Sequence, residues 1–297
     1  MLVGDSVLLQ KGDKIFRPSD VGEPVEMAGT WTLRFNNGAV ITTVGKTLFM
    51  TAEDAQKTFN WTSLDNLSRY SIFPRPEHMI RPEVNWNSKI ELSEYTSKEG
   101  EFDLADLEFA KFAGAFLATY KTVLKFPGAY VFNKEKFMPY VPSAEKIYPS
   151  GAVSIEEKHI VLQKCWVDEL LDAIFNITDD VISIPDDLIL KVSKEWAEAL
   201  RDGYLSCVTW DKTRTAYVAS YIYAQFLSDL GVLMNLHSID YQIAVKENVC
   251  GNLDISIKLN RTGGILTIID GYENVTPQIL YDVGEGEFNA SGVMLKG

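Results

Sequence analysis

Residues 104–126, LADLEFAKFAGAFLATYKTVLKF, constrain the fold of this chain more than any other stretch. Their apolar residues recur with a helical period. The polar stripe of the expected helix is narrow and consists of Glu108, Lys111, Thr119 and Thr122. A helix with so little polar surface is stable only when neighbouring elements cover most of it. We therefore expect this helix at the centre of the fold, ended by Pro127-Gly128.

Short runs typical of β-strands occupy both ends of the sequence. In the first fifty residues, Asn37-Gly38 separates TWTLRF from AVITTV and predicts a hairpin, because both turn residues tolerate positive φ. Near the other end, LDISIKL (253–259) alternates apolar and polar residues with a period of two, and ILTIID and QILYDV follow it. Between these ends, helical patterns predict further helices over residues 154–175, 185–203 and 212–235.

This order of elements predicts an α+β fold. We expect a small N-terminal β module, a central helical layer of about four helices and a C-terminal antiparallel β meander. The corresponding domains are a β-rich N-terminal module (1–58), an irregular arm rich in aromatic residues and proline (59–100), and an α+β core domain with the C-terminal meander (101–297).

The charge balance excludes several classes of partner. The chain has 28 basic and 41 acidic side chains, a formal net charge of −13, which repels nucleic-acid backbones and anionic lipid. The longest apolar run, residues 215–228, is shorter than the roughly 20 residues that span a bilayer. The three cysteines lack metal-ligand spacing, and the first residues lack the features of a signal peptide. We therefore expect a cytoplasmic protein that binds neither nucleic acid nor membranes directly.

Two glycine-containing stretches invite a phosphate-binding interpretation. Gly263-Gly264 and Gly271 lie in TGGILTIIDGYEN, and Gly45-Lys46-Thr47 resembles the end of a P-loop. A phosphate site needs its glycines between a strand and the start of a helix. Here each stretch lies among strand-like runs, so we interpret both as turns. Nucleotide binding at the degenerate turn around Lys46 remains a third functional hypothesis.

The common catalytic motifs are missing from the sequence. It contains neither GxSxG, SxxK nor HExxH, and we therefore predict no catalytic, cofactor-binding or metal-binding residue and no cofactor. The acidic pairs Asp179-Asp180 and Asp186-Asp187 keep open an alternative, a metal-assisted enzyme of unfamiliar type, because divalent ions prefer carboxylate oxygens. Asp168 and Asp172, one helical turn apart, are interpreted as solvated surface.

The arm is the feature that core formation explains least. Its aromatic, methionine and arginine side chains are of the types enriched at protein interfaces. The interface candidates are Trp61, Phe73, Arg75, Met79, Arg81 and Trp86. A loop folded onto its own domain would use the same residues, and the sequence favours neither reading. The leading hypothesis is a non-enzymatic interaction or scaffolding protein that forms a homo-oligomer.

The mixture of small β modules with loops such as NWT (60–62) and PRPEH (74–78) resembles proteins of large tailed bacteriophages, including those that build a nucleus-like shell. The resemblance implies a phage-encoded protein that acts in the cytoplasm of the infected cell through contacts with phage or host proteins. It implies no individual site residue.

Overall fold

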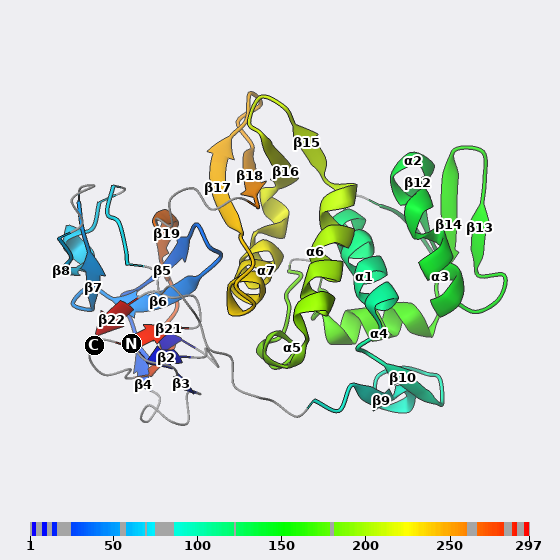
Figure 1. Ribbon diagram of the computed structural model, residues 1–297, viewed down its shortest axis with the longest axis horizontal. Coiled ribbons are helices and arrows are strands. Elements are labelled where there is room, and N and C mark those ends of the chain that lie inside the picture. The colour runs from blue at the N-terminus through cyan, green and yellow to red at the C-terminus, as the bar shows by residue number, and fades with distance from the viewer. Residues whose placement is uncertain are drawn as a thin grey trace. The chain divides into compact units, whose positions relative to one another are not determined.

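The fold is seen in a computed structural model (Figure 1), which describes residues 2–3, 8–10, 14–16, 25–53, 58–68, 70–74, 86–121, 123–178, 181–259, 266–281, 287–289 and 294–296. Two compact units make up the chain. Unit 1 combines Met1–Glu83 with Leu227–Gly297, and unit 2 is Val84–Phe226. This division differs from the boundaries expected at residues 58 and 100, because C-terminal strands pair with N-terminal ones.

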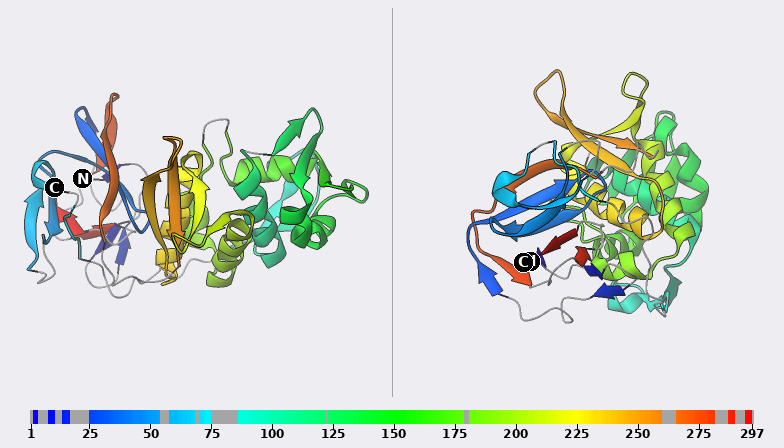
Figure 2. Two further views of the ribbon diagram at one scale, coloured as in Figure 1. Left: turned by 90° about the horizontal axis from the view of Figure 1, so that it is seen from above. Right: turned by 60° about the vertical axis from the view of Figure 1, so that its left-hand side comes forward.

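The central sheet of unit 1 has the order β19-β5-β6 and is antiparallel. β5 (Thr30–Phe35) and β6 (Val40–Val44) form the expected hairpin, in which Gly38 has a φ of 92°. β19 (Ile268–Glu273) pairs with the other side of β5, with a register shift between Ile268 and Asp270. Figures 1 and 2 show this C-terminal strand beside the two N-terminal ones.

One face of this sheet carries the hydrophobic core of unit 1. The core residues are Leu33, Phe35, Ala39, Ile41, Phe49, Phe73 and Leu266. Phe73 meets the rings of Phe35 and Phe49 edge-on, with centroids 5.0 and 6.0 Å apart. Partly buried Leu64, Leu67 and Ile268 complete the layer. The core therefore joins segments from both ends of the chain.

Two further sheets of unit 1 have the orders β1-β20-β4 and β3-β2-β21-β22-β7-β8. Their bounds are β1 Leu2–Val3, β2 Leu8–Gln10, β3 Lys14–Phe16, β4 Val25–Met27, β7 Leu48–Thr51, β8 Asn60–Ser63, β20 Gln278–Tyr281, β21 Glu287–Asn289 and β22 Met294–Lys296. A short 3₁₀ turn, η2 (Leu64–Asn66), follows β8. Each sheet again mixes strands from the two ends of the sequence.

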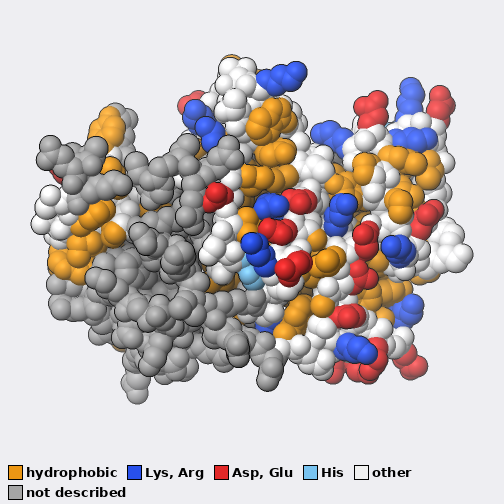
Figure 3. Space-filling model, viewed as in Figure 1, with side chains coloured by type: hydrophobic (Ala, Val, Ile, Leu, Met, Phe, Trp, Pro, Cys, Tyr) orange, Lys and Arg blue, Asp and Glu red, His pale blue; other side chains and the backbone are white. Residues whose placement is uncertain are grey.

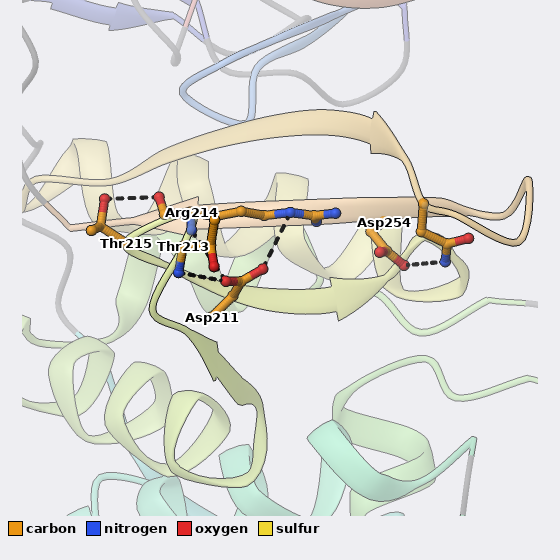
Figure 4. A network of polar contacts seen from close by, with 6 residues as sticks. Asp211, Thr213, Arg214, Thr215 and Asp254 are labelled. Carbon is orange, nitrogen blue, oxygen red and sulfur yellow. Dashed lines mark hydrogen bonds and ion pairs between the residues drawn. The ribbon is translucent and has the colours of Figure 1, made fainter.

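Helix α7 (Ala224–Leu236) contributes residues 227–236 to unit 1. A Cβ on Gly38 would lie 2.4 Å from the Ser228 carbonyl oxygen and 2.8 Å from the Gly231 Cα, so the backbones of the hairpin turn and the helix are in direct contact. The β17 (Gln242–Glu247) and β18 (Leu253–Lys258) hairpin follows the helix. The side-chain amide of Asn248 donates to Asp254 at 3.2 Å and braces this hairpin (Figure 4).

Unit 2 is built on helices α1 (Leu107–Thr119) and α6 (Lys194–Cys207), which lie side by side in Figure 1. α1 is the central apolar helix expected from the sequence, and its residues Phe109–Leu117 are buried apart from Lys111. The expected end at Pro127-Gly128 is wrong, because the helix ends at Thr119 and residues Leu124–Phe126 form β11. The two backbones meet at Gly114 and Gly203, where an added Cβ would lie 2.1 and 2.0 Å from the opposing carbonyl oxygens of Leu200 and Lys111.

A four-stranded antiparallel sheet, β11-β12-β14-β13, packs in unit 2 beside these helices. Its strands are β11 Leu124–Phe126, β12 Ala129–Asn133, β13 Val153–Ile155 and β14 His159–Gln163. The remaining elements are β9 Lys89–Glu91, η3 Leu92–Glu94, β10 Glu101–Asp103, α2 Lys134–Phe137, η4 Met138–Tyr140, α3 Val141–Ile147, α4 Trp166–Ile174, α5 Asp186–Lys191 and η5 Tyr221–Tyr223. Alternating Tyr130 and Phe132 on β12, and Ile160 and Leu162 on β14, are buried.

The β15 (Thr209–Asp211) and β16 (Ala216–Ser220) hairpin replaces the first half of the helix expected over residues 212–235. Asp211 closes its turn by accepting the backbone N–H groups of Thr213 at 2.8 Å and Arg214 at 3.1 Å (Figure 4). Thr215 then adopts a positive φ of 47°. A short acceptor side chain at this position offers the backbone an alternative to helical hydrogen bonds.

Two other segments that were expected to be continuous helices are also only partly helical. Within residues 154–175, strands β13 and β14 come first, and α4 begins only at Trp166, where the Asp168 carboxylate accepts the Cys165 N–H at 2.7 Å. Within residues 185–203, an N-cap interrupts the helix, because the Ser193 hydroxyl accepts the Trp196 N–H. The α+β class is confirmed: helices and antiparallel sheets are both present, and antiparallel strands lie at both ends of the chain.

Candidate functional site

Unit 1 contains a groove of about 460 Å³ on the apolar face of its central sheet. Its lining residues come from β5, β19 and the segment around η2: Trp31, Leu33, Leu64, Asp65, Leu67, Ser68, Ile268, Ile269, Asp270 and Gly271. The apolar members continue the core of the unit to the surface, where the Trp31 side chain is 38% exposed. A core layer that opens to solvent beside an exposed tryptophan is typical of a binding surface.

Gly271 keeps this groove open. It lies opposite Leu33 in the pairing of β19 with β5, and a Cβ on Gly271 would lie 2.9 Å from the Leu33 Cδ2 atom. Because Gly271 has no side chain, it leaves space beside Leu33 on the neighbouring strand. The other glycines of TGGILTIIDGYEN, Gly263 and Gly264, lie outside the described residues. The interpretation of Gly271 as part of a turn is wrong, because β19 continues through it to Glu273.

The opposite face of the same sheet is polar and buried, and it holds the strands in register. Arg34 donates to Asp270 at 2.9 Å through Nη1 and to the Ser228 hydroxyl at 2.8 Å through Nε. The hydroxyls of Thr32 and Thr42 are hydrogen-bonded at 2.9 Å, and Asn274 contacts Thr32. Because these buried groups are satisfied, they make the sheet a rigid support for the groove.

The charge at the groove is negative. Asp65 is exposed on one wall, and within the described part of the chain its carboxylate has no hydrogen bond or ion pair. Glu273 lies opposite Trp31 and is exposed. The Asp270 carboxylate is already engaged by Arg34. Among the residues that the structure describes, no lysine, arginine or histidine lines the groove, so the described lining favours a ligand with basic groups over an anion.

The turn at Gly45-Lys46-Thr47 connects β6 to β7 and precedes a strand, as expected. The Thr47 N–H donates to the Val44 carbonyl and closes the turn. A Cβ on Gly45 would lie 3.2 Å from an Asp65 carboxylate oxygen. The turn therefore has an acid beside it and no helix N-terminus after it, an arrangement that disfavours a bound phosphate.

Three of the six interface candidates, Trp61, Phe73 and Trp86, lie within the described residues. Trp61 lies on β8 of unit 1 and is half-buried, and Trp86 is half-buried in unit 2. Phe73 is buried in the core of unit 1, with its backbone bridged to Leu266, so its side chain packs within its own unit. Arg75, Met79 and Arg81 lie outside the described residues. None of the groove residues was among the interface candidates, and Gly271 had been considered only for phosphate binding. The available signal was a tryptophan, Trp31, within a short strand-like run.

The acidic residues form no metal centre in the described part of the chain. Asp179 and Asp180 lie outside it, and Asp187 pairs with Lys191 at 3.0 Å. The interpretation of Asp168 as solvated surface is wrong. Asp168 is buried, accepts the Tyr148 hydroxyl at 3.0 Å and has a raised pKa because of burial.

Two thiols, the partly buried Cys165 and the buried Cys207, are poor nucleophiles at neutral pH. Burial raises the pKa of Cys165 and of Cys207, which keeps both sulfurs protonated.

On the face of unit 2 visible in Figure 3, acidic, basic and hydrophobic side chains are interspersed, and no single sign of charge dominates. Among the described helices, none has the length and hydropathy that a transmembrane span requires.

Neither the protein-family models nor the curated proteins with which the chain was compared match it.

Proposed function

We propose that this chain is a non-enzymatic protein-interaction or scaffolding protein that uses the unit 1 groove to bind an extended, basic and apolar segment of a partner protein. The observation that carries the proposal is the continuous apolar lining from Leu33 to the exposed Trp31, flanked by the carboxylates of Asp65 and Glu273. Tryptophan at the centre of a groove is the residue type that contributes most binding energy at interfaces.

The topology of the sheet favours an extended ligand. Among the described strands, β19 lies at one edge of the β19-β5-β6 sheet, so its backbone can accept a further strand. In such binding, main-chain hydrogen bonds supply affinity and alternate side chains enter pockets. A partner strand with apolar residues directed at Leu64, Leu67 and Ile268, and with lysine or arginine towards Asp65, satisfies both the shape and the charge of the groove.

The resemblance to proteins of large tailed bacteriophages adds a place of action to the proposal. A phage-encoded scaffold would meet its partners, phage or host proteins or further copies of the chain, in the cytoplasm of the infected cell. A homo-oligomer would present several such grooves at once and would bind multivalent partners more tightly than one groove does.

Selection from a displayed library of peptides of about eight residues, a little longer than a typical strand, tests the groove. We expect enrichment of peptides in which Lys or Arg alternates with apolar residues. Trp31→Ala should weaken the selected peptides about 30-fold or more, as expected for a tryptophan hot spot. Trp210→Ala, which removes an exposed tryptophan of unit 2, is the matched control and should leave binding unchanged.

Two further variants separate shape from charge. Gly271→Ala places a methyl group in the groove against the flexible end of Leu33 and should reduce binding while the protein stays folded. Asp65→Asn should reduce the preference for lysine and arginine. Enrichment of acidic peptides, or binding that is indifferent to Trp31→Ala, would show the proposal to be wrong. Light scattering of the wild type, Trp61→Ala and Trp86→Ala tests the homo-oligomer and the arm separately.

A further inference from the structure

Unit 2 contains a cavity of about 350 Å³, a volume within the range of small-molecule sites. It lies where the end of α1 meets strands β11, β12 and β14, helix α2 and the last residue of α6. Its apolar wall consists of Ala118, Val123, Leu124, Val131, Phe132 and Phe137. Leu124 at its mouth is exposed, whereas Phe132 and Phe137 are buried, so the cavity runs from the surface towards the core. An apolar ligand body would be covered on several sides.

Hydrogen-bond donors gather at one end of this cavity. Asn133 and His159 lie directly opposite each other in the pairing of β12 with β14, and Lys136 follows on α2. The Oδ1 atom of Asn133 accepts the backbone N–H of Lys136 at 3.3 Å. The side-chain NH₂ group of Asn133 points away from this hydrogen bond and can therefore donate to a ligand. The imidazole supplies an N–H, and the lysine ammonium supplies three. All three side chains are exposed at the mouth.

Among the described residues of the same lining there is no aspartate or glutamate, although acidic residues exceed basic ones by thirteen in the whole chain. The Thr119 hydroxyl and the Cys207 thiol, which also line the cavity, already contact backbone carbonyl groups of the protein. The Thr119 hydroxyl donates to the helix carbonyls of Ala115 and Phe116, and the buried Cys207 thiol contacts the Lys136 carbonyl oxygen at 3.9 Å. The cavity thus combines an apolar interior with a rim that donates hydrogen bonds and carries one full positive charge.

We propose that this cavity binds a small carboxylate with an apolar body. The carboxylate would accept hydrogen bonds from Lys136, His159 and Asn133, and the body would lie against Val131, Phe132 and Phe137 with Cys207 at its buried end. One ammonium matches the single charge of a carboxylate, and charge-assisted hydrogen bonds are the strongest that this rim can form. The site belongs to unit 2 and is independent of the groove in unit 1.

Cys207 provides a reporter inside the cavity. In a Cys165→Ser, Cys250→Ser background, the rate at which a small methanethiosulfonate reagent modifies Cys207 can be followed by mass spectrometry. Hexanoate, present at about ten times its dissociation constant, should slow the modification about tenfold by occupying the cavity. Hexanamide and hexylamine have the same body without the negative charge and should protect much less. Equal protection by all three compounds, or no protection by hexanoate, would overturn the proposal. This test needs no substitution of a rim residue.

Lys136→Met tests the rim, and Lys136→Arg should restore binding. Removing the charged donor should weaken hexanoate about tenfold or more, measured by calorimetry. Lys134→Met is the matched control, because Lys134 is on the same short helix, does not line the cavity and donates instead to the Glu156 carbonyl at 2.9 Å. Hexanoate binding that is equally reduced in both variants, while both keep the wild-type melting temperature, contradicts the proposed role of Lys136.

Discussion

The crossing of α1 and α6 in unit 2 depends on two glycines, and replacing either with alanine tests how closely the helices approach. A Cβ on Gly203 would lie 2.0 Å from the Lys111 carbonyl oxygen, and one on Gly114 would lie 2.1 Å from the Leu200 oxygen and 2.7 Å from the Tyr204 nitrogen. These neighbours are helix backbone and cannot rotate aside as a side chain can. The helices must therefore separate by about 1 Å to restore ordinary contact.

Two effects oppose each other in these variants. Alanine favours a helix over glycine by about 1 kcal/mol. Forcing an extra methyl group into a well-packed core costs about 1–3 kcal/mol, and more when the backbone itself must move. Separation also loosens the packing of buried neighbours such as Phe112 and Tyr204. We expect the steric cost to win, with a net loss of about 2 kcal/mol of stability for Gly114→Ala and for Gly203→Ala.

Hydrogen exchange of residues 107–119 and 194–207 measures this loss within unit 2 alone. A loss of about 2 kcal/mol raises the exchange rate of the most protected amides about 30-fold. The double variant should lose less than the sum of the single losses, because one displacement relieves both contacts. Asp202→Ala, next to Gly203 on the exposed side of α6, should change stability by less than about 0.5 kcal/mol. Single variants as stable as the wild type or more stable would refute the prediction, since the steric cost would then not exceed the gain of about 1 kcal/mol in helix propensity.

Two further predictions concern the acidic residues of α4. Tyr148→Phe should reduce the stability of unit 2 by about 1–3 kcal/mol in urea unfolding, because it removes a hydroxyl donor from the buried Asp168 carboxylate; an unchanged midpoint would contradict this hydrogen bond. Burial, followed by the charge of Asp168, raises the pKa of Asp172 from 3.8 to about 6. The unfolded chain therefore loses this proton first, and the wild-type free energy of unfolding should fall as the pH rises between those values. Asp172 keeps contact with solvent, which limits its part of the fall to about 1 kcal/mol, and the fall should be smaller in Asp172→Asn, where the raised pKa of Asp168 still contributes; parallel pH profiles would refute the shift.

The parts of the fold that the sequence predicted well are those governed by local chemistry. The Asn37-Gly38 hairpin needs positive φ, and the central helix needs only its own apolar periodicity, so both are evident from a few adjacent residues. The expected helices over residues 154–175 and 212–235 were partly wrong for an equally local reason. The apolar pattern alone suggested continuous helix at Asp168 and Asp211. Instead, their carboxylates accept backbone N–H groups, and these hydrogen bonds begin α4 and close the turn of the β15–β16 hairpin.

The partners of the C-terminal strands could not be deduced from pattern. β19 and β20 have the alternation of strands, but their hydrogen-bond partners β5, β1 and β4 lie more than two hundred residues away. Periodicity states which face of a strand is apolar and says nothing about which distant strand covers its edge. The groove was missed for the same reason, because Trp31, Leu67 and Gly271 become neighbours only after this pairing.

This long-range pairing has a consequence for binding at the groove. One wall of the groove is β19, and the floor beneath it is β5, so the site exists only while the C-terminal segment is paired with the N-terminal one. The Arg34–Asp270 ion pair on the buried face joins the same two strands and strengthens that pairing. A ligand that adds to β19 and contacts Trp31 bridges both segments, so its binding energy also stabilises their association. Binding at the groove and the integrity of unit 1 are therefore linked, and each should protect the other against unfolding.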